Sequence, residues 1–458
     1  MRHFPLLISV VVSAALLAAC GDRKSASAPA PPAAAAPAPA AAKESLSFDE
    51  GLAQAKARQA PLIVDFHAPW CYSCYFMATN VLTGAEWDAV EKKSVVIEVD
   101  ADSPEGAALK EKHGIKALPS YLVLDGEGQE LGRILGEKTR AEFYPEINTI
   151  LSRGQPLDAL RAKVTDGSPA ALEAGRAILK SYHARYDADG GLQWLASLPA
   201  PAREALQKDA DGGLTVQRLQ FLQAAQKEDA KTALAVGRQV LAGNLGCERS
   251  YELDRYLGFA VKQADAKALL AAQRPAADQL VADGVFGATP CADKRSAVLA
   301  TADLYDALGD KPARQALLEK AIADVEKQIG GDLRKDRNLD DNLRVYNDQL
   351  AVLSGDYAAY DALMPKLIEA WPDDYVYAGR WGKSLLARGK AAEALPQLEK
   401  AADKAYGVNR LKVAQDRVKA LQALKRDADA RQVAADTLKT NGPWFPDEAA
   451  KLKELVKA

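Results

Sequence analysis

The sequence predicts a small α/β sandwich followed by a longer all-α array of paired helices. Between residues 45 and 154, short apolar runs alternate with capped helical segments and finish in a hairpin signal. From residue 156 onward, apolar residues recur at helical spacing without a convincing strand run. At 458 residues, the chain is also too long for one compact core. At least two structural units are therefore expected.

The composition is that of a folded globular chain. Hydrophobic residues make up 48%, charged residues 26%, and the formal net charge is −3. This balance argues against disorder over most of the length. A near-neutral chain lacks the basic excess that displaces counterions, so no nucleic-acid partner is expected. Aromatic residues are 7%, which leaves Ala and Leu to supply much of the apolar content, as in helices packed on helices.

The first nineteen residues have the features of an export signal. Arg2 and His3 precede a largely apolar run, 6–19, which is too short to cross a hydrocarbon core of about 30 Å. The small residues before Cys20 are similar to a bacterial lipoprotein signal, in which cleavage leaves this cysteine N-terminal and lipidated. The alternative is an ordinary secretory signal with an incidental cysteine.

A spacer follows the predicted lipid anchor. Every residue in 28–42 is Ala or Pro, so this stretch cannot build a core and its prolines block a continuous helix. We therefore expect a lipidated cysteine and linker over 20–44, which tether a periplasmic protein to a membrane. Gly21 after Cys20, by analogy with lipoproteins, favours the outer membrane.

Each element of the α/β unit has its own signal. Ser47 with Glu50, Thr83 with Glu86 and Thr139 with Glu142 have capping-box spacing and predict three helix starts. Ser103-Pro104-Glu105 opens another helix, which ends near Gly114. The predicted strands are 62–66, 94–99, 121–124 and 129–135, the last two around the turn Asp125-Gly126-Glu127-Gly128.

A Cys-x-x-Cys motif follows the first strand. Cys71 falls at a predicted helix start, where free backbone N–H groups and the helix dipole stabilise a thiolate. Cys74, one turn later on the same face, can resolve a mixed disulfide. Asp65 lies on the buried strand, six residues before Cys71, where a carboxylate can relay the proton of the resolving thiol. Pro119 precedes the hairpin strands, and a cis peptide there would expose backbone groups to an extended substrate.

These residues resemble the thioredoxin superfamily, and within it the C-terminal periplasmic domain of membrane thiol:disulfide interchange reductases. The shared features are a hydrophobic-Asp-Phe run, Trp70-Cys71-x-x-Cys74, Leu118-Pro119 before two strands, the Asp-Gly-x-Gly hairpin and Gly136. The resemblance, over about 45–152, implies that Cys71 attacks, Cys74 resolves, Asp65 is the buried base and Pro119 is cis. Trp70 would shield the sulfurs or close the turn.

Two departures leave the direction of electron flow open. The central dipeptide is Tyr72-Ser73 rather than Gly-Pro, and Tyr75 replaces the usual lysine. The dipeptide tunes thiolate stability, and reduction potentials in this superfamily span about −120 to −270 mV. Two other interpretations of the cysteine pair are a metal site with His67 and a permanently closed structural disulfide, although no second ligand pair sits at zinc spacing.

The remaining chain, 155–458, resembles a tetratricopeptide-like solenoid. Gly355-Asp356-Tyr357 and Gly389-Lys390-Ala391 lie 34 residues apart, the tetratricopeptide period. Gly382 and Ala394 are small, as expected where paired helices cross. The polar stretch 332–342 has the character of an inserted loop or a helix extension. Such arrays expose a concave surface that binds a peptide or protein, although the region could instead serve as a plain scaffold.

Cys247 and Cys291 lie in the helical part. Two cysteines in one periplasmic domain often pair, so a structural disulfide is favoured. The other interpretation is a second redox pair serviced by the first. Neither cysteine has a helix-start Cys-x-x-Cys context, which argues against that role.

Together these features predict a lipid-anchored periplasmic thiol:disulfide oxidoreductase, with a reductase or isomerase favoured. Its partners would be periplasmic proteins that carry thiols or disulfides, held by the helical repeats, with a membrane electron donor as a further candidate. No cofactor is expected beyond the Cys71–Cys74 pair, since no convincing nucleotide-binding fingerprint is present. The alternative is a periplasmic interaction scaffold whose Cys-x-x-Cys disulfide is regulatory.

Overall fold

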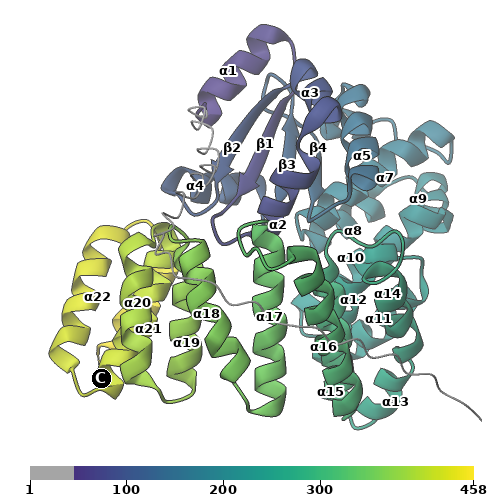
Figure 1. Ribbon diagram of the computed structural model, residues 1–458. Helices are drawn as coiled ribbons and strands as arrows, with labels where there is room; N and C mark the ends of the chain where they lie inside the picture. Colours follow the sequence, from purple (N-terminus) through teal and green to yellow (C-terminus); the bar gives the residue numbers. More distant parts are fainter. Residues whose placement is uncertain (1–45, 458) are drawn as a thin grey trace, which may run out of the picture. The chain divides into compact units, whose positions relative to one another are not determined.

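The structure is a computed structural model that describes residues 46–457. The predicted signal peptide, Cys20 and the whole Ala/Pro linker lie outside the described residues. The chain from Ser45 onward forms one compact unit (Figure 1). Within residues 46–457, no helix has both the length and the apolar character needed to cross a membrane.

An α/β part comes first. Its elements are α1 (Phe48–Arg58), β1 (Leu62–His67), α2 (Tyr72–Phe76), the π-helical turn η1 (Met77–Val81), α3 (Gly84–Lys93), β2 (Val95–Asp100), α4 (Pro104–His113), β3 (Ser120–Leu124), β4 (Glu130–Leu135) and α5 (Arg140–Arg153). All four predicted strands and the capped helices are therefore present, with ends that differ by one or two residues.

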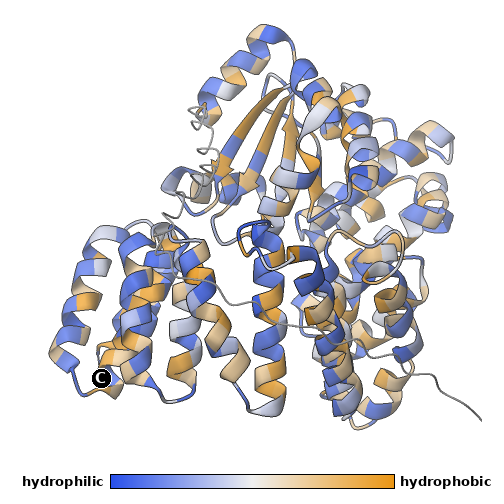
Figure 2. Ribbon diagram, viewed as in Figure 1, coloured by the Kyte–Doolittle hydropathy of each residue, from blue (hydrophilic) through white to orange (hydrophobic). Residues whose placement is uncertain are grey.

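The four strands form a mixed sheet in the order β2-β1-β3-β4. β1 pairs in parallel with β2 and antiparallel with β3, and β3 pairs antiparallel with β4. Alternate residues of β1 point to opposite faces. Leu62, Val64 and Phe66 pack with α1 and α4, whereas Ile63 packs with α3 and α5. The strands are accordingly mainly apolar (Figure 2).

One of the three predicted capping boxes is wrong. The Ser47–Glu50 and Thr139–Glu142 boxes form with both hydrogen bonds. Thr83 does precede α3, but its side chain makes no capping bond. Glu86 instead accepts hydrogen bonds from Arg140, with Nη2–Oε2 at 2.6 Å. The Glu86 carboxylate is therefore bound to Arg140 and does not form the predicted capping box with Thr83.

Every regular element after residue 156 is helical. These elements are α6 (Leu157–Arg161), α7 (Pro169–Ala184), α8 (Ala188–Ser197), α9 (Ala200–Lys208), α10 (Ala210–Gln226), α11 (Ala230–Ala242), the 3-10 turn η2 (Gly246–Glu248), α12 (Arg249–Ala260), α13 (Ala266–Ala271), α14 (Arg274–Gly284), α15 (Lys294–Ala307), α16 (Lys311–Ile329), α17 (Arg337–Ser354), α18 (Ala358–Ala370), α19 (Tyr375–Ala387), α20 (Ala391–Lys404), α21 (Gly407–Ala423), α22 (Asp427–Asn441) and α23 (Pro446–Leu455).

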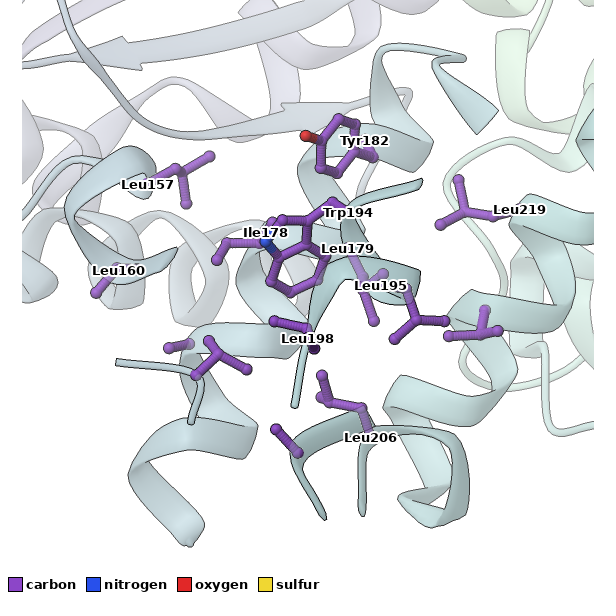
Figure 3. Close-up of a cluster of buried hydrophobic side chains, with 14 of the residues drawn as sticks. Leu157, Leu160, Ile178, Leu179, Tyr182, Trp194, Leu195, Leu198, Leu206 and Leu219 are labelled. Atoms are coloured by element: carbon purple, nitrogen blue, oxygen red, sulfur yellow. The ribbon is translucent and has the colours of Figure 1, made fainter. Parts of the chain in front are cut away.

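The helices bury a succession of apolar clusters. In the first, Trp194 lies among leucine and isoleucine side chains from α6 to α10 (Figure 3). Further along, a disulfide joins Cys247 in η2 to Cys291, before α15. The 34-residue spacing has a structural counterpart, because Gly355 and Gly389 both adopt φ +75° just after α17 and α19 end. L-residues rarely adopt this conformation, which favours glycine there.

We expect Gly382→Ala to lower stability where α19 crosses α20. A Cβ atom at Gly382 would lie 2.6 Å from Leu398 Cγ. Overpacking of this kind costs about 1–3 kcal/mol, which outweighs the gain of about 1 kcal/mol in helix propensity. The midpoint of denaturant unfolding should therefore fall.

Gly379→Ala is the matched control on the same helix. Its Cβ would meet Ala401 Cβ at 3.6 Å, an ordinary contact. This substitution should be neutral or stabilising by about 1 kcal/mol or less. Equal effects of the two substitutions would contradict the packing argument.

Candidate redox site

The Cys-x-x-Cys motif lies in the turn between β1 and α2 and in the first turn of α2. β1 ends at His67, and Cys71 is the N-cap residue of α2. Cys71 and Cys74 form a disulfide, and Cys71 Sγ accepts a hydrogen bond from the Cys74 backbone N–H at 3.1 Å. The two residues are 5% and 9% exposed. After reduction, the start of this helix provides the N–H groups and dipole that favour a Cys71 thiolate.

The Leu118–Pro119 peptide lies against this disulfide and is cis. Leu118 packs on the small cluster that contains both cysteines. The Pro119 carbonyl accepts a hydrogen bond from Gly136 N–H at 2.9 Å. Gly136 adopts φ +87°, a conformation that L-residues rarely take. The loop before β3 and the end of β4 are thus joined beside the sulfurs.

Asp65 is a buried carboxyl on the same strand that leads to Cys71. It lies opposite Glu98 on β2 and Tyr121 on β3. The residue keeps some exposure, but its Oδ1 is buried without a hydrogen-bond partner. Burial, and then the negative charge of Glu98, raise the pKa of Asp65 to about 8. The carboxyl is therefore mainly neutral near pH 7, where its protonated form can donate a proton and its smaller ionised fraction can accept one.

Trp70 packs beside Cys71 and Cys74 and connects them to the residues after β2 and to α21. Its indole Nε1–H donates to Asp102 Oδ2 at 2.5 Å. The same Asp102 oxygen accepts from Asn409 Nδ2 of α21 at 2.6 Å. Nearby, Tyr406 O–H donates to Asp100 Oδ2 at 2.5 Å. The residue before Cys71 is therefore held through a carboxylate that the helical region also binds.

Tyr72, between the two cysteines, is bound directly by the helical region. Its hydroxyl donates to Asp374 Oδ2 at 3.0 Å, and its carbonyl accepts from Asn338 Nδ2 at 3.1 Å. The side chain is 2% exposed and belongs to an apolar cluster with residues of α17 to α21. α2 accordingly lies against α17 (Figure 1). We call these contacts of Asn338 and Asp374 with Tyr72 the Tyr72 clamp.

The aromatic residue after Cys74 is held on the same side. The Arg337 guanidinium lies 4.5 Å from the centre of the Tyr75 ring and 4.3 Å from that of Trp371. Such cation–π contacts stabilise by about 0.5–2 kcal/mol. Tyr375 and Tyr377 are buried in the apolar cluster around Tyr72.

Glu137 was not among the site residues predicted from the sequence. In the structure its side chain lies beside Ser73, between the two cysteines of the motif. Glu137 follows Gly136 at the end of β4 and is 9% exposed. Burial, and then Asp293, raise the pKa of this carboxyl well above its usual range, while a hydrogen bond with Ser73 opposes the shift. Its position one residue after Gly136 was the available signal.

No sequence signal identifies the partners in the Tyr72 clamp. Asn338 and Asp374 lie 266 and 302 residues from Tyr72 along the chain. Asn338 belongs to the polar stretch that was expected to be an inserted loop or a helix extension. In the described part of the chain, no three His, Cys, Asp or Glu side chains are grouped as a metal site.

Comparison with known proteins matches the α/β part. A family model described as thioredoxin-like matches residues 42–126. Thioredoxin-like protein HCF164 of Arabidopsis thaliana is 26% identical over 118 residues, which are 26% of this chain and 43% of that protein. Thiol:disulfide interchange protein DsbD of Klebsiella pneumoniae is 30% identical over 103 residues, 22% of this chain and 17% of that protein.

A third relative is thiol:disulfide interchange protein TxlA of Synechococcus elongatus. It is 26% identical over 109 residues, 24% of this chain and 56% of that protein. The chain thus spans between 17% and 56% of the length of these three relatives. Together with the disulfide geometry, the matches show that the chain contains a thioredoxin-like domain with a Cys71–Cys74 disulfide, followed by a long all-helical region.

Proposed function

We propose that this protein is a thiol:disulfide oxidoreductase that exchanges disulfides with protein partners, in the direction of reduction or isomerisation. The observation that carries the proposal is the Cys71–Cys74 disulfide at the start of α2, packed against Leu118. Two of the relatives are named thiol:disulfide interchange proteins, which supports the same chemistry.

Each residue of the site would have a defined role in the exchange. The Cys71 thiolate attacks one sulfur of a partner disulfide, forms a mixed disulfide and releases the other partner sulfur as a thiolate. Cys74 then attacks Cys71 Sγ, which releases the partner as a dithiol and leaves Cys71–Cys74 oxidised. Asp65, in the fraction of molecules in which it is ionised, accepts the proton of the Cys74 thiol. A dithiol reductant returns two electrons for the next cycle.

We propose that Cys20 carries a lipid and that the protein works in the periplasm, on the outer membrane. The apolar run 6–19, the small residues before Cys20 and the Ala/Pro spacer support this location. We also propose that the helices form a tetratricopeptide-like array that holds protein partners. The equivalent glycines Gly355 and Gly389 support that assignment.

Replacing Cys74 by Ser should trap partners on Cys71. The variant can form the mixed disulfide but cannot resolve it, so disulfide-linked complexes should accumulate in cells. They can be detected by non-reducing electrophoresis and identified by mass spectrometry.

Cys71→Ser provides the control for this experiment, because it removes the attacking sulfur and should give no complexes. If Cys74→Ser also gives none while partner binding persists, the chain is an interaction scaffold with a regulatory disulfide instead.

Replacing Asp65 by Asn should slow the resolution step. Loss of a general acid–base typically costs about 10²-fold or more. The rate at which Cys74 releases a thiol from a Cys71 mixed disulfide, measured by stopped flow, should fall accordingly. An unchanged rate would remove Asp65 from the mechanism.

The same variant tests the Asp65 pKa through stability. The pKa of about 8 lies above the unfolded value of about 3.9, so the folded state binds the proton more tightly. The stabilisation that the protonated Asp65 carboxyl gives the folded state is fully present below about pH 4 and is lost as the pH rises to about 8. The stability of Asp65→Asn relative to the parent should therefore increase over this interval.

Glu98→Gln should lower the pH at which the stabilisation by protonated Asp65 is lost, because the Glu98 charge raises the pKa of Asp65.

A further inference from the structure

Three side chains of the helical region form a continuous series of hydrogen bonds that ends on the Cys-x-x-Cys motif. Arg295 Nε on α15 donates to Asn342 Oδ1 at 2.5 Å, and Asn342 Nδ2 donates to Asn338 Oδ1 at 3.1 Å, both asparagines lying on α17. Asn338 Nδ2 then donates to the Tyr72 carbonyl at 3.1 Å. Asn338 and Asn342 are buried, so water competes little for these bonds. We call Arg295, Asn342 and Asn338 the donor series.

The groups at the two ends fix the direction of every bond in the donor series. A guanidinium N–H can only donate, and a backbone carbonyl can only accept. Both amides between Arg295 and Tyr72 must therefore accept on the Arg295 side and donate toward the motif. Their dipoles are aligned with the positive ends toward Tyr72, and hydrogen bonds in such a series polarise one another.

The end of the donor series that lies away from the motif is positively charged. Arg295 Nη1 lies 2.8 Å from Asp341 Oδ2, and Arg344 Nε donates to Asp341 Oδ1 at 2.6 Å. Burial opposes ionisation of Asp341, but Arg344 and then Arg295 lower its pKa to about 2, so the carboxyl is ionised. Two guanidinium groups share one carboxylate, which leaves positive charge in excess there.

The donor series acts on the peptide group that adjoins the attacking sulfur. The Tyr72 carbonyl belongs to the same peptide group as the Ser73 N–H, in the first turn of α2. Cys71 is the N-cap of this helix, and its Sγ already accepts from the Cys74 N–H at 3.1 Å. The free N–H groups of a first turn point toward the N-cap. A donor on the Tyr72 carbonyl polarises this peptide group, makes the Ser73 N–H a stronger donor and so favours negative charge at Cys71.

Other charged or titratable groups face the motif from β1, from the segments after β2 and β4, and from α17 and α19. Burial is the first cause that raises the pKa of the carboxyls on β1, after β4 and at the N-cap of α19, which favours their neutral forms. In those forms they do not offset the donor series. The groups are Asp65, Asp102, Glu137, Arg337, Asp374 and Arg380.

We propose that Asn338, Asn342 and Arg295 are positioning residues for the exchange reaction, and that their aligned hydrogen bonds stabilise the Cys71 thiolate from within the helical region. The proposal rests on the proposed thiol:disulfide exchange at Cys71. It gives the helical region a part in the chemistry itself, because α15 and α17 supply the donors.

The test measures Cys71 in the reduced full chain that carries Cys74→Ser, which is the parent for every variant. The Cys71 thiolate attacks the methylene carbon of iodoacetamide, an S–C bond forms and iodide leaves, so the alkylation rate follows the thiolate fraction. Mass spectrometry of the Cys71 peptide gives this rate at each pH. Asn342→Leu interrupts the donor series and should lower the thiolate fraction, at pH values below the midpoint, by about tenfold.

Asn342→Asp separates this effect from mechanical support of the motif. The substituted carboxylate has nearly the same shape and still accepts from Arg295, but it cannot donate to Asn338 and it adds negative charge. It should lower the thiolate fraction at least as much as Asn342→Leu does. Mechanical support alone would make Asn342→Leu the more harmful of the two, and that order would overturn the proposal.

Arg295→Leu tests the half-buried end of the donor series and leaves the Tyr72 contact in place. It should lower the thiolate fraction by about threefold. Loss of Arg295 also removes a charge that lowers the pKa of Glu137. A more neutral Glu137 would favour the thiolate, so a fall in the thiolate fraction cannot come from that carboxyl.

Asn347→Leu is the matched control on α17. The Asn347 amide donates to the Leu343 carbonyl of its own helix at 2.9 Å, outside the donor series, so this variant should keep the parent profile. The proposal is overturned if the variants at Asn342 and Arg295 also keep that profile, or if Asn347→Leu shifts it equally. Circular dichroism checks that each variant folds, and Arg295→Leu still tests the proposal if a variant at the buried Asn342 does not.

Failure of the proposed function alone gives a different result. The Cys74→Ser trapping experiment would then yield no mixed disulfides, while the Cys71 alkylation profile would still respond to Asn342→Leu. A parent Cys71 that ionises like a free cysteine would overturn the present proposal, because no stabilised thiolate would exist.

Discussion

The contact between Tyr72 and the helical region is the constraint that holds the Cys-x-x-Cys motif in place. The residue between the two cysteines has its hydroxyl bound by Asp374 and its carbonyl by Asn338. Both groups are buried, where an unpaired polar atom costs about 1–3 kcal/mol. The clamp therefore holds the start of α2 against α17 and makes the helical region a structural part of the site.

Electrostatics near the sulfurs complement this arrangement. Asp65 and Glu137 are acidic groups whose pKa values are raised chiefly by burial. A raised pKa favours the neutral form of each carboxyl, and a neutral carboxyl does not oppose a thiolate at Cys71, whereas an ionised one would. The helix start favours that thiolate, so in the proposed exchange the attack and the proton transfer would depend on different groups held by the same strand and helix.

Local chemistry explains what could be predicted from the sequence. The strands, the helix start at Cys71, two capping boxes and the all-helical character after residue 156 all arise from residues within a few positions of each other. Packing determined the rest. Glu86 binds Arg140 instead of capping α3, and Asn338 and Asp374 meet Tyr72 across 266 and 302 residues. Such partners are selected by the shape and burial of two folded surfaces, which leave no periodic trace in the chain.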